Sequence, residues 1–148
     1  MCPPLLRKMT EEQRDQVVKA HCDLPSGCRR EPATEEQIRD FESSFGPIPE
    51  DYRWYLITCG GGVIGSEWVD GIEELPTTHR KVRDGGYTIS NFFPIGWDGS
   101  GNPFGFDTVA GVILCEDHDF GGIHQEAEDF YGLLLIKGLI TESEQAAP

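Results

Sequence analysis

The sequence predicts an α+β domain with helices at its N-terminal side, a central, mainly antiparallel twisted sheet, and a closing C-terminal helix. Three observations predict this order. Two capping boxes open helical stretches before residue 60, short β-like segments separated by glycine-rich turns fill the middle, and helically spaced apolar residues return near the end. With 148 residues, the chain has the length of one ordinary domain.

The first 32 residues are expected to form a helical extension and a linker. The capping box Thr10-Glu11-Glu12-Gln13 predicts a helix over residues 11–21, which would bury Val17, Val18 and Ala20. Proline, glycine, serine and arginine gather in residues 23–32 and indicate a linker. The predicted organisation is an extension at 1–32, a domain at 33–140 and a short tail at 141–148.

Two helices are expected to open the domain. A second capping box, Thr34-Glu35-Glu36-Gln37, begins the first of them. This helix should stop at Gly46, because glycine accepts a left-handed conformation and Pro47 cannot continue the helix. Pro49 suits the first turn of the next helix, which should end at the glycines of residues 60–62.

A meander of about five or six strands is expected after residue 62. The β-like segments are residues 63–69, 87–89, 92–97, 104–107 and 112–115. Pro94 marks an edge position or a bulge, and turns at 98–102 and 108–111 join the last three segments as hairpins. Residues 72–82 are ambiguous and suggest a short helix broken by Pro76. The closing helix is predicted over residues 125–137, with Ala127, Phe130, Leu133 and Leu134 facing inward.

Charge limits the classes of partner. The chain carries a formal charge of −14, with +2 in residues 1–30 and −16 in the rest. This negative field repels nucleic acid and anionic membranes, because both bind proteins through lysine and arginine side chains. It favours a basic protein partner. The alternative is that the charge serves solubility alone. The chain lacks a signal-peptide pattern and an apolar run of membrane-spanning length, so a cytoplasmic protein is expected, either a monomer or a weak homodimer.

Motifs for metals, cofactors and common catalytic centres are incomplete. Five cysteines are an odd number and are read as reduced thiols, and His21, Cys22 and Cys28 do not have zinc-site spacing. The turn at Asp98 resembles the start of a calcium loop but has Pro103 where glycine is needed. No cofactor, metal or catalytic residue is therefore predicted.

The strongest enzymatic alternative is an acidic and imidazole cluster, which could hold a divalent metal or perform acid–base chemistry. The residues are Glu116, Asp117, His118 and Asp119, with His124. Because the cluster falls in a predicted strand-to-helix loop, where solvated polar residues are expected, we rank it behind a binding function.

Two tryptophans lie beside carboxylates. Trp68 is flanked by Glu67 and Asp70, and Trp97 precedes Asp98. Core packing is the usual role of such residues, but aromatic side chains rimmed by carboxylates would also suit an anchoring patch for a basic partner. Trp54 lies off the main apolar stripe of its helix and either widens the core face or lies near the surface.

The order of motifs resembles the SUKH superfamily, which includes the Smi/Knr type of fungal cell-wall regulators and many bacterial immunity proteins. The resemblance rests on Ile38-x-x-Phe41-x-x-x-Phe45-Gly46, Ile48-Pro49-Glu50-Asp51-Tyr52-x-x-Tyr55-Leu56, Phe93-Pro94-Ile95-Gly96, Asp98-Gly99-Ser100-Gly101-Asn102 and Ala127-x-x-Phe130-x-x-x-Leu134. It covers about residues 34–136. The departures are Cys59, where the family usually has asparagine, and residues 1–30, which have no counterpart.

The resemblance implies a SUKH-like domain that binds protein and is not an enzyme. Bacterial members are thought to neutralise a secreted toxin, often a nuclease or deaminase, by binding it. Fungal members instead suggest a regulatory scaffold or adaptor. The candidate contacts are chosen as loop-borne carboxylates and aromatic residues: Glu67, Trp68, Asp70, Glu73, Glu74, Trp97, Asp98, Asp117 and Asp119.

Overall fold

A computed structural model describes residues 8–64, 67–117 and 122–140. The helices in these ranges are α1 (Glu11–Cys22), a 3-10 turn η2 (Ser26–Cys28), α2 (Glu35–Phe45), α3 (Glu50–Thr58), α4 (Leu75–Asp84) and α5 (Phe130–Lys137). The strands are β1 (Gly62–Ile64), β2 (Glu67–Val69), β3 (Phe92–Trp97), β4 (Pro103–Asp107), β5 (Ile113–Asp117) and β6 (Gly122–Ala127). This is the α+β order that the sequence predicts.

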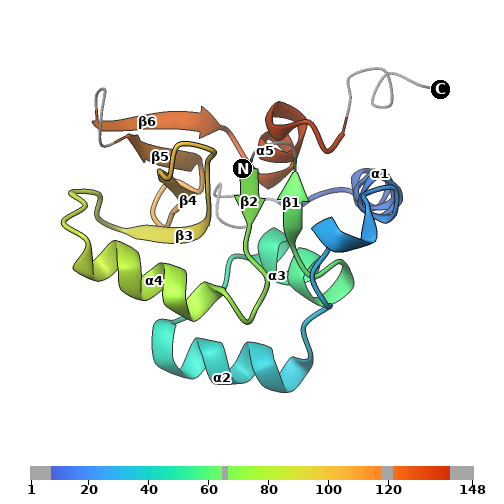
Figure 1. The fold of residues 1–148 in the computed structure, drawn as a ribbon, viewed down its shortest axis with the longest axis horizontal. Helices are drawn as coiled ribbons and strands as arrows, with labels where there is room; N and C mark the ends of the chain where they lie inside the picture. The colour runs from blue at the N-terminus through green and yellow to red at the C-terminus, as the bar shows by residue number, and fades with distance from the viewer. Residues whose placement is uncertain (1–7, 65–66, 118–121, 141–148) are drawn as a thin grey trace.

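The strands form one antiparallel meander in the order β1-β2-β3-β4-β5-β6. The β3–β4 register shifts between Pro94 and Gly96, which confirms the bulge that Pro94 suggested. Figure 1 shows α4 running beneath β3 with α2 beyond it, while α1 lies at the opposite side of the molecule from the β3–β6 part of the sheet.

Both capping boxes are formed, at Thr10 and at Thr34. Helix α1 buries Val17 and Ala20 as predicted, whereas Val18 is half-buried; His21 is also buried and was missed. His21 Nδ1 lies 3.1 Å from the Tyr55 hydroxyl of α3. The N-terminal extension therefore packs on the domain, and its separation from the domain at residue 32 stays a prediction.

The predicted strand at residues 87–89 is wrong. These residues form an irregular segment held by the Glu116 carboxylate, which accepts hydrogen bonds from the Thr88 and Ile89 amides at 2.7–3.0 Å. Side-chain bonding thus replaces the strand ladder that the apolar pattern suggested.

The closing helix is shorter than predicted. Residues 122–127 form β6, paired with β5, and α5 begins only after Asp129, whose side chain accepts a hydrogen bond from the Gly132 amide. Ala127 is three residues before Phe130, as on one face of a helix, but it is the last residue of β6.

Helix α4 is not broken by Pro76, contrary to the sequence interpretation. It begins at Leu75 and places Pro76 in its first turn, where the missing amide has no helical acceptor to lose. The helix then runs unbroken to Asp84 along β3. This placement sets α4 opposite the end of β2.

A close approach of β2 to β3 requires Gly96. A Cβ atom there would lie 2.0 Å from the Trp68 carbonyl oxygen and 2.7 Å from the Phe104 ring. Because no side chain fits, Gly96 allows Trp68 and Trp97 to pair directly across the two strands.

Candidate functional site

A cleft of about 560 Å³ opens between the β2–β3 strand pair and α4. Its lining residues are Trp68, Asp70, Glu73, Glu74, Thr77, Thr78, Lys81 and Trp97. Five of the nine predicted contact residues therefore meet at one place: both tryptophans, Asp70, Glu73 and Glu74. We call this hollow the tryptophan cleft.

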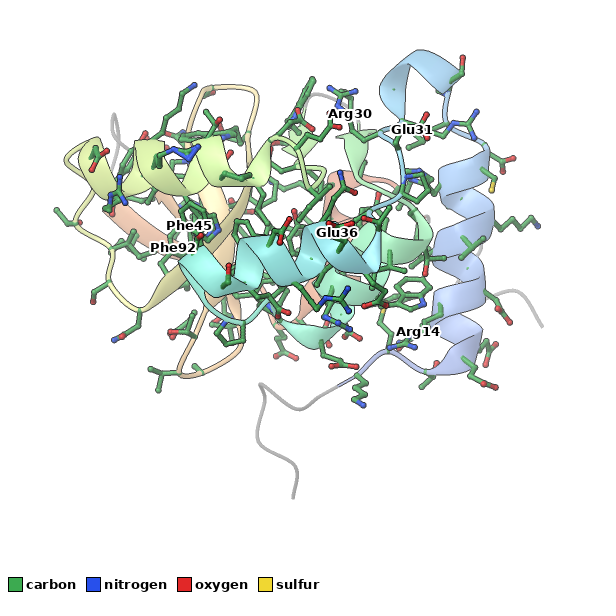
Figure 2. The ribbon with its side chains drawn as sticks, turned by 90° about the horizontal axis from the view of Figure 1, so that it is seen from below. Arg14, Arg30, Glu31, Glu36, Phe45 and Phe92 are labelled. Carbon is green, nitrogen blue, oxygen red and sulfur yellow. The ribbon has the colours of Figure 1, made fainter. Side chains whose placement is uncertain are left out.

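Glu74 organises one wall of the tryptophan cleft. Its Oε2 accepts a hydrogen bond from the Trp68 indole at 2.7 Å, and its Oε1 accepts from Arg30 Nε at 3.0 Å and from the Gly71 amide at 3.1 Å. The Arg30 guanidinium lies 4.1 Å from the centroid of the Trp68 ring, within the range of a cation–π contact. Figure 2 shows Arg30 beyond the N-terminal end of α4. The Glu74 carboxylate is thus occupied by the protein itself.

Thr78 on α4 holds Trp97, the second tryptophan of the cleft. Its hydroxyl accepts a hydrogen bond from the Trp97 indole nitrogen at 2.9 Å. The Tyr87 ring lies 6.4 Å from the Trp97 ring, centroid to centroid. Since both indole N–H groups are bonded to α4 or the turn before it, the two tryptophans are fixed in place before any ligand arrives.

Asp70 lies at the floor of the tryptophan cleft. Its amide donates to the Ile95 carbonyl at 2.8 Å and its own carbonyl accepts from the Tyr52 hydroxyl at 2.7 Å. The residue is only 1% exposed, and its Oδ2 atom has no hydrogen-bond partner among the residues that the structure describes. Burial, with a smaller contribution from the Glu74 charge, raises the pKa of Asp70 to about 7, although Thr78, Arg30 and Lys81 oppose the shift.

Three of the remaining predicted contacts do not line the cleft. Glu67 is 3.7 Å from the Lys137 ammonium, and the Asp98 carboxylate accepts hydrogen bonds from the Ser100 and Asn102 amides at 2.9 Å within its own turn. Asp117 ends β5, away from the cleft lining, and Asp119 falls outside the described residues. Glu67, Asp98 and Asp117 are therefore not among the residues that line the cleft.

The enzymatic alternative is not assembled by the described residues as the sequence suggested. Glu116 is buried and bonded to Thr88 and Ile89, while His118 and Asp119 lie outside the described residues. His124 instead lies across from Cys115 on neighbouring strands.

Cys115, His124 and Glu126 bring their donor atoms within 4.8 Å of one another and could hold a metal ion. Burial raises the pKa of the Cys115 thiol to about 12, so the thiol is neutral at physiological pH. The Lys137 ammonium lies 3.6 Å from Glu126 and already supplies a positive charge to this group.

Sequence reasoning missed the cleft residues supplied by α4, which are Thr77, Thr78 and Lys81, and the linker residue Arg30, which lies over the Trp68 ring. Reading Pro76 as a first-turn residue would have placed Leu75 and Thr78 one turn apart on a single buried face. Arg30 had no such signal, because its approach to Trp68 depends on how the linker folds back: the Arg30 amide donates to the Gly61 carbonyl.

Among the described residues, no helix is both long and apolar enough to cross a membrane. The sequence finds no match among curated proteins. A family model described as the SMI1 / KNR4 family (SUKH-1) matches residues 32–135, which hold α2, α3, α4, the six described strands and all but the end of α5. The chain belongs to the SMI1/KNR4 (SUKH-1) family.

Proposed function

We propose that this SUKH domain is a non-catalytic immunity protein that binds and neutralises a basic toxin domain, such as a nuclease, in the cytoplasm. The observation that carries the proposal is the tryptophan cleft, where two fixed indoles meet three carboxylates. The chain around it has a formal charge of −14. This combination suits an anchor point for a positively charged protein surface.

The size of the cleft indicates its role within a larger contact. A volume of about 560 Å³ accommodates a few side chains, not a folded domain. A stable protein–protein interface buries roughly 800 Å² on each partner. The cleft would therefore take one or two anchoring side chains, while the acidic surface around it steers the partner during encounter.

Capture from lysate of the source cells tests the proposal first. We expect the tagged protein to retain one basic protein with a secreted-toxin domain, more firmly at about 50 mM than at about 300 mM salt, because screening weakens charge attraction. The captured domain is then expressed in a sensitive host with and without this protein. Survival only in the presence of this protein supports immunity, whereas a harmless domain or an unprotected host overturns it.

The alternative function is a regulatory scaffold or adaptor, which is compatible with the chain's membership of the SMI1/KNR4 family. A scaffold would retain several signalling or cell-wall proteins, and expressing these proteins would not be toxic. The same two steps therefore separate the alternatives.

A further inference from the structure

We propose that the floor of the tryptophan cleft binds the ammonium group of a lysine side chain from the partner protein, with Asp70 as its counter-ion. This inference rests on the proposed partner-binding function and specifies the chemical group that anchors the partner. It depends on which carboxylates of the cleft are already occupied, on the two indole walls, and on the unpartnered oxygen of Asp70.

The carboxylates of the cleft are not equivalent. Glu74 is occupied by Trp68, Arg30 and the Gly71 amide. Asp70 is buried, and its Oδ2 has no hydrogen-bond partner in the described part of the chain. A buried acceptor without a partner is destabilising in the free protein. A donor arriving at the floor would satisfy this atom. Glu73 is exposed at the rim and adds a second negative charge along the entry path.

The indole walls suit the rest of a lysine side chain. Trp68 and Trp97 stand opposite each other in the strand register and both line the cleft. A chain of four methylene groups packs against such rings, and the ammonium at its end gains a cation–π attraction. Because both indole N–H groups are already bonded, the rings would bind the ligand through their apolar surfaces and π systems.

One available oxygen favours lysine over arginine. A guanidinium binds best to two carboxylate oxygens at once, while an ammonium is a compact donor that needs only one. Among the described residues, Oδ2 is the buried oxygen of Asp70 that lacks a hydrogen-bond partner. Since Asp70 is 1% exposed, neighbouring side chains must move aside for direct contact.

The charges that face Asp70 come from three elements. The turn before α4 supplies Glu73 and Glu74, α4 supplies Lys81, and the linker supplies Arg30, which is paired with Glu74. Lys81 is exposed and forms no ion pair within the described part of the chain. When Asp70 is ionised, the two negative charges of Asp70 and Glu73 exceed the single positive charge of Lys81, so the floor attracts one more cation.

The test uses the full-length protein and a minimal probe, Nα-acetyl-lysine methylamide. Binding is followed through the indole N–H signals of the three tryptophans in proton–nitrogen NMR spectra. We expect saturable shifts of Trp68 and Trp97. Trp54 provides an internal control, because it lies on α3, contacts Arg14 and is not among the residues that line the cleft. The Nε-acetylated probe, which is neutral, should not bind, and the arginine analogue should bind more weakly.

The decisive variant is Asp70→Asn, which removes the charge while keeping the shape of the side chain. At pH 8 we expect it to weaken binding of the lysine probe about tenfold, and its melting temperature verifies that it is folded. Glu36→Gln removes one negative charge from an exposed site on α2 and should leave the probe affinity unchanged. For the parent, the affinity should rise about tenfold from pH 6 to pH 8, because Asp70 with a pKa of about 7 becomes ionised over that range.

Several results would overturn the inference: equal probe affinity in the parent and Asp70→Asn, equal binding of the neutral probe, or shifts of Trp54 that match those of Trp68. The immunity proposal fails separately. If the probe binds as expected but no toxin is neutralised, the cleft chemistry stands without that function. If a toxin is neutralised equally by Asp70→Asn and the probe does not bind, only the lysine anchor is refuted.

Discussion

Asp70 should make the stability of this protein depend on pH in an unusual direction. Most carboxylates stabilise the folded state when ionised, but burial raises the pKa of Asp70 from 3.8 to about 7. Above pH 3.8 the unfolded chain loses the proton first, so stability falls as pH rises until the folded carboxyl also ionises near pH 7. The Asp70→Asn variant removes this titration while preserving the size of the side chain.

The magnitude follows from the two pKa values. Between pH 5.5 and about pH 7, a span of about 1.5 pH units, the Asp70 carboxyl is ionised in the unfolded chain but largely protonated in the folded protein. Over this span the contribution of Asp70 to the free energy of unfolding of the parent falls by about 1.4 kcal/mol per pH unit. The stability of Asp70→Asn relative to the parent should therefore rise by about 2 kcal/mol across this range. The sign is independent of how the substitution affects packing, because packing contributes equally at both pH values.

The parent's pH profile alone would not reveal this effect. His79 packs among Phe41, Phe45 and Phe93, and burial lowers its pKa from 6.5 to about 4. The unfolded chain therefore binds the extra proton below pH 6.5, so His79 increases stability as pH rises, opposite to Asp70. The difference between variant and parent cancels this shared background.

Urea unfolding followed by circular dichroism at pH 5.5 and pH 8 measures the free energy of unfolding of the parent, Asp70→Asn and the control Glu36→Gln. The stability difference between Glu36→Gln and the parent should change by no more than about 0.5 kcal/mol between the two pH values, since the Glu36 side chain is exposed in the parent. If Asp70→Asn behaves like this control, the carboxyl of Asp70 titrates normally and the argument for a buried, perturbed group is refuted.

Three further predictions test the remaining parts of the structure. Deleting residues 1–32 should lower the free energy of unfolding by more than about 3 kcal/mol, because it removes the fully buried Val17 and uncovers α3; an unchanged thermal midpoint would contradict this packing. Gly96→Ala should destabilise the fold by at least about 2 kcal/mol in urea unfolding and shift the Trp68 indole signal, since its Cβ would lie 2.0 Å from a carbonyl oxygen; a parent-like spectrum would argue against the close approach. Glu73→Lys should slow association with a basic partner severalfold at low salt in surface plasmon resonance while leaving the thermal midpoint unchanged, whereas Glu74→Lys should also lower the midpoint, because Glu74 holds the wall of the cleft. Parent-like association of Glu73→Lys would remove the steering argument.

Local chemistry explains why much of the fold could be predicted from the sequence. The capping boxes at Thr10 and Thr34 act within four residues, so their helices were placed within one residue at the N-terminal end. The hairpin around Asp98 was equally readable, because turn residues specify it locally. Errors arose where a distant partner decided the structure, as at Thr88 and Ile89, whose amides are held by Glu116.

The tryptophan cleft shows the same limit in the candidate site. Glu73, Glu74 and Asp70 are close in sequence to Trp68, so their grouping was predictable, and Trp97 joins them through strand pairing. Asp98, chosen for the same composition, is only one residue from Trp97 but directs its carboxylate into its own turn. Composition thus identifies residues that suit an anchor. Which of these carboxylates remain available to a partner depends on the hydrogen bonds that each already accepts within the protein.

That distinction changes which residues should control recognition. By charge alone, Glu73, Glu74 and Asp70 would be interchangeable acidic contacts. The structure separates them into three kinds. Glu73 is exposed and can steer a partner, Glu74 is bonded and fixes Trp68, and Asp70 is buried with one oxygen that no described residue satisfies. Since steering acts on the association rate and a buried counter-ion acts on the lifetime of the complex, substitutions at Glu73 and Asp70 should change different rate constants of the same interaction.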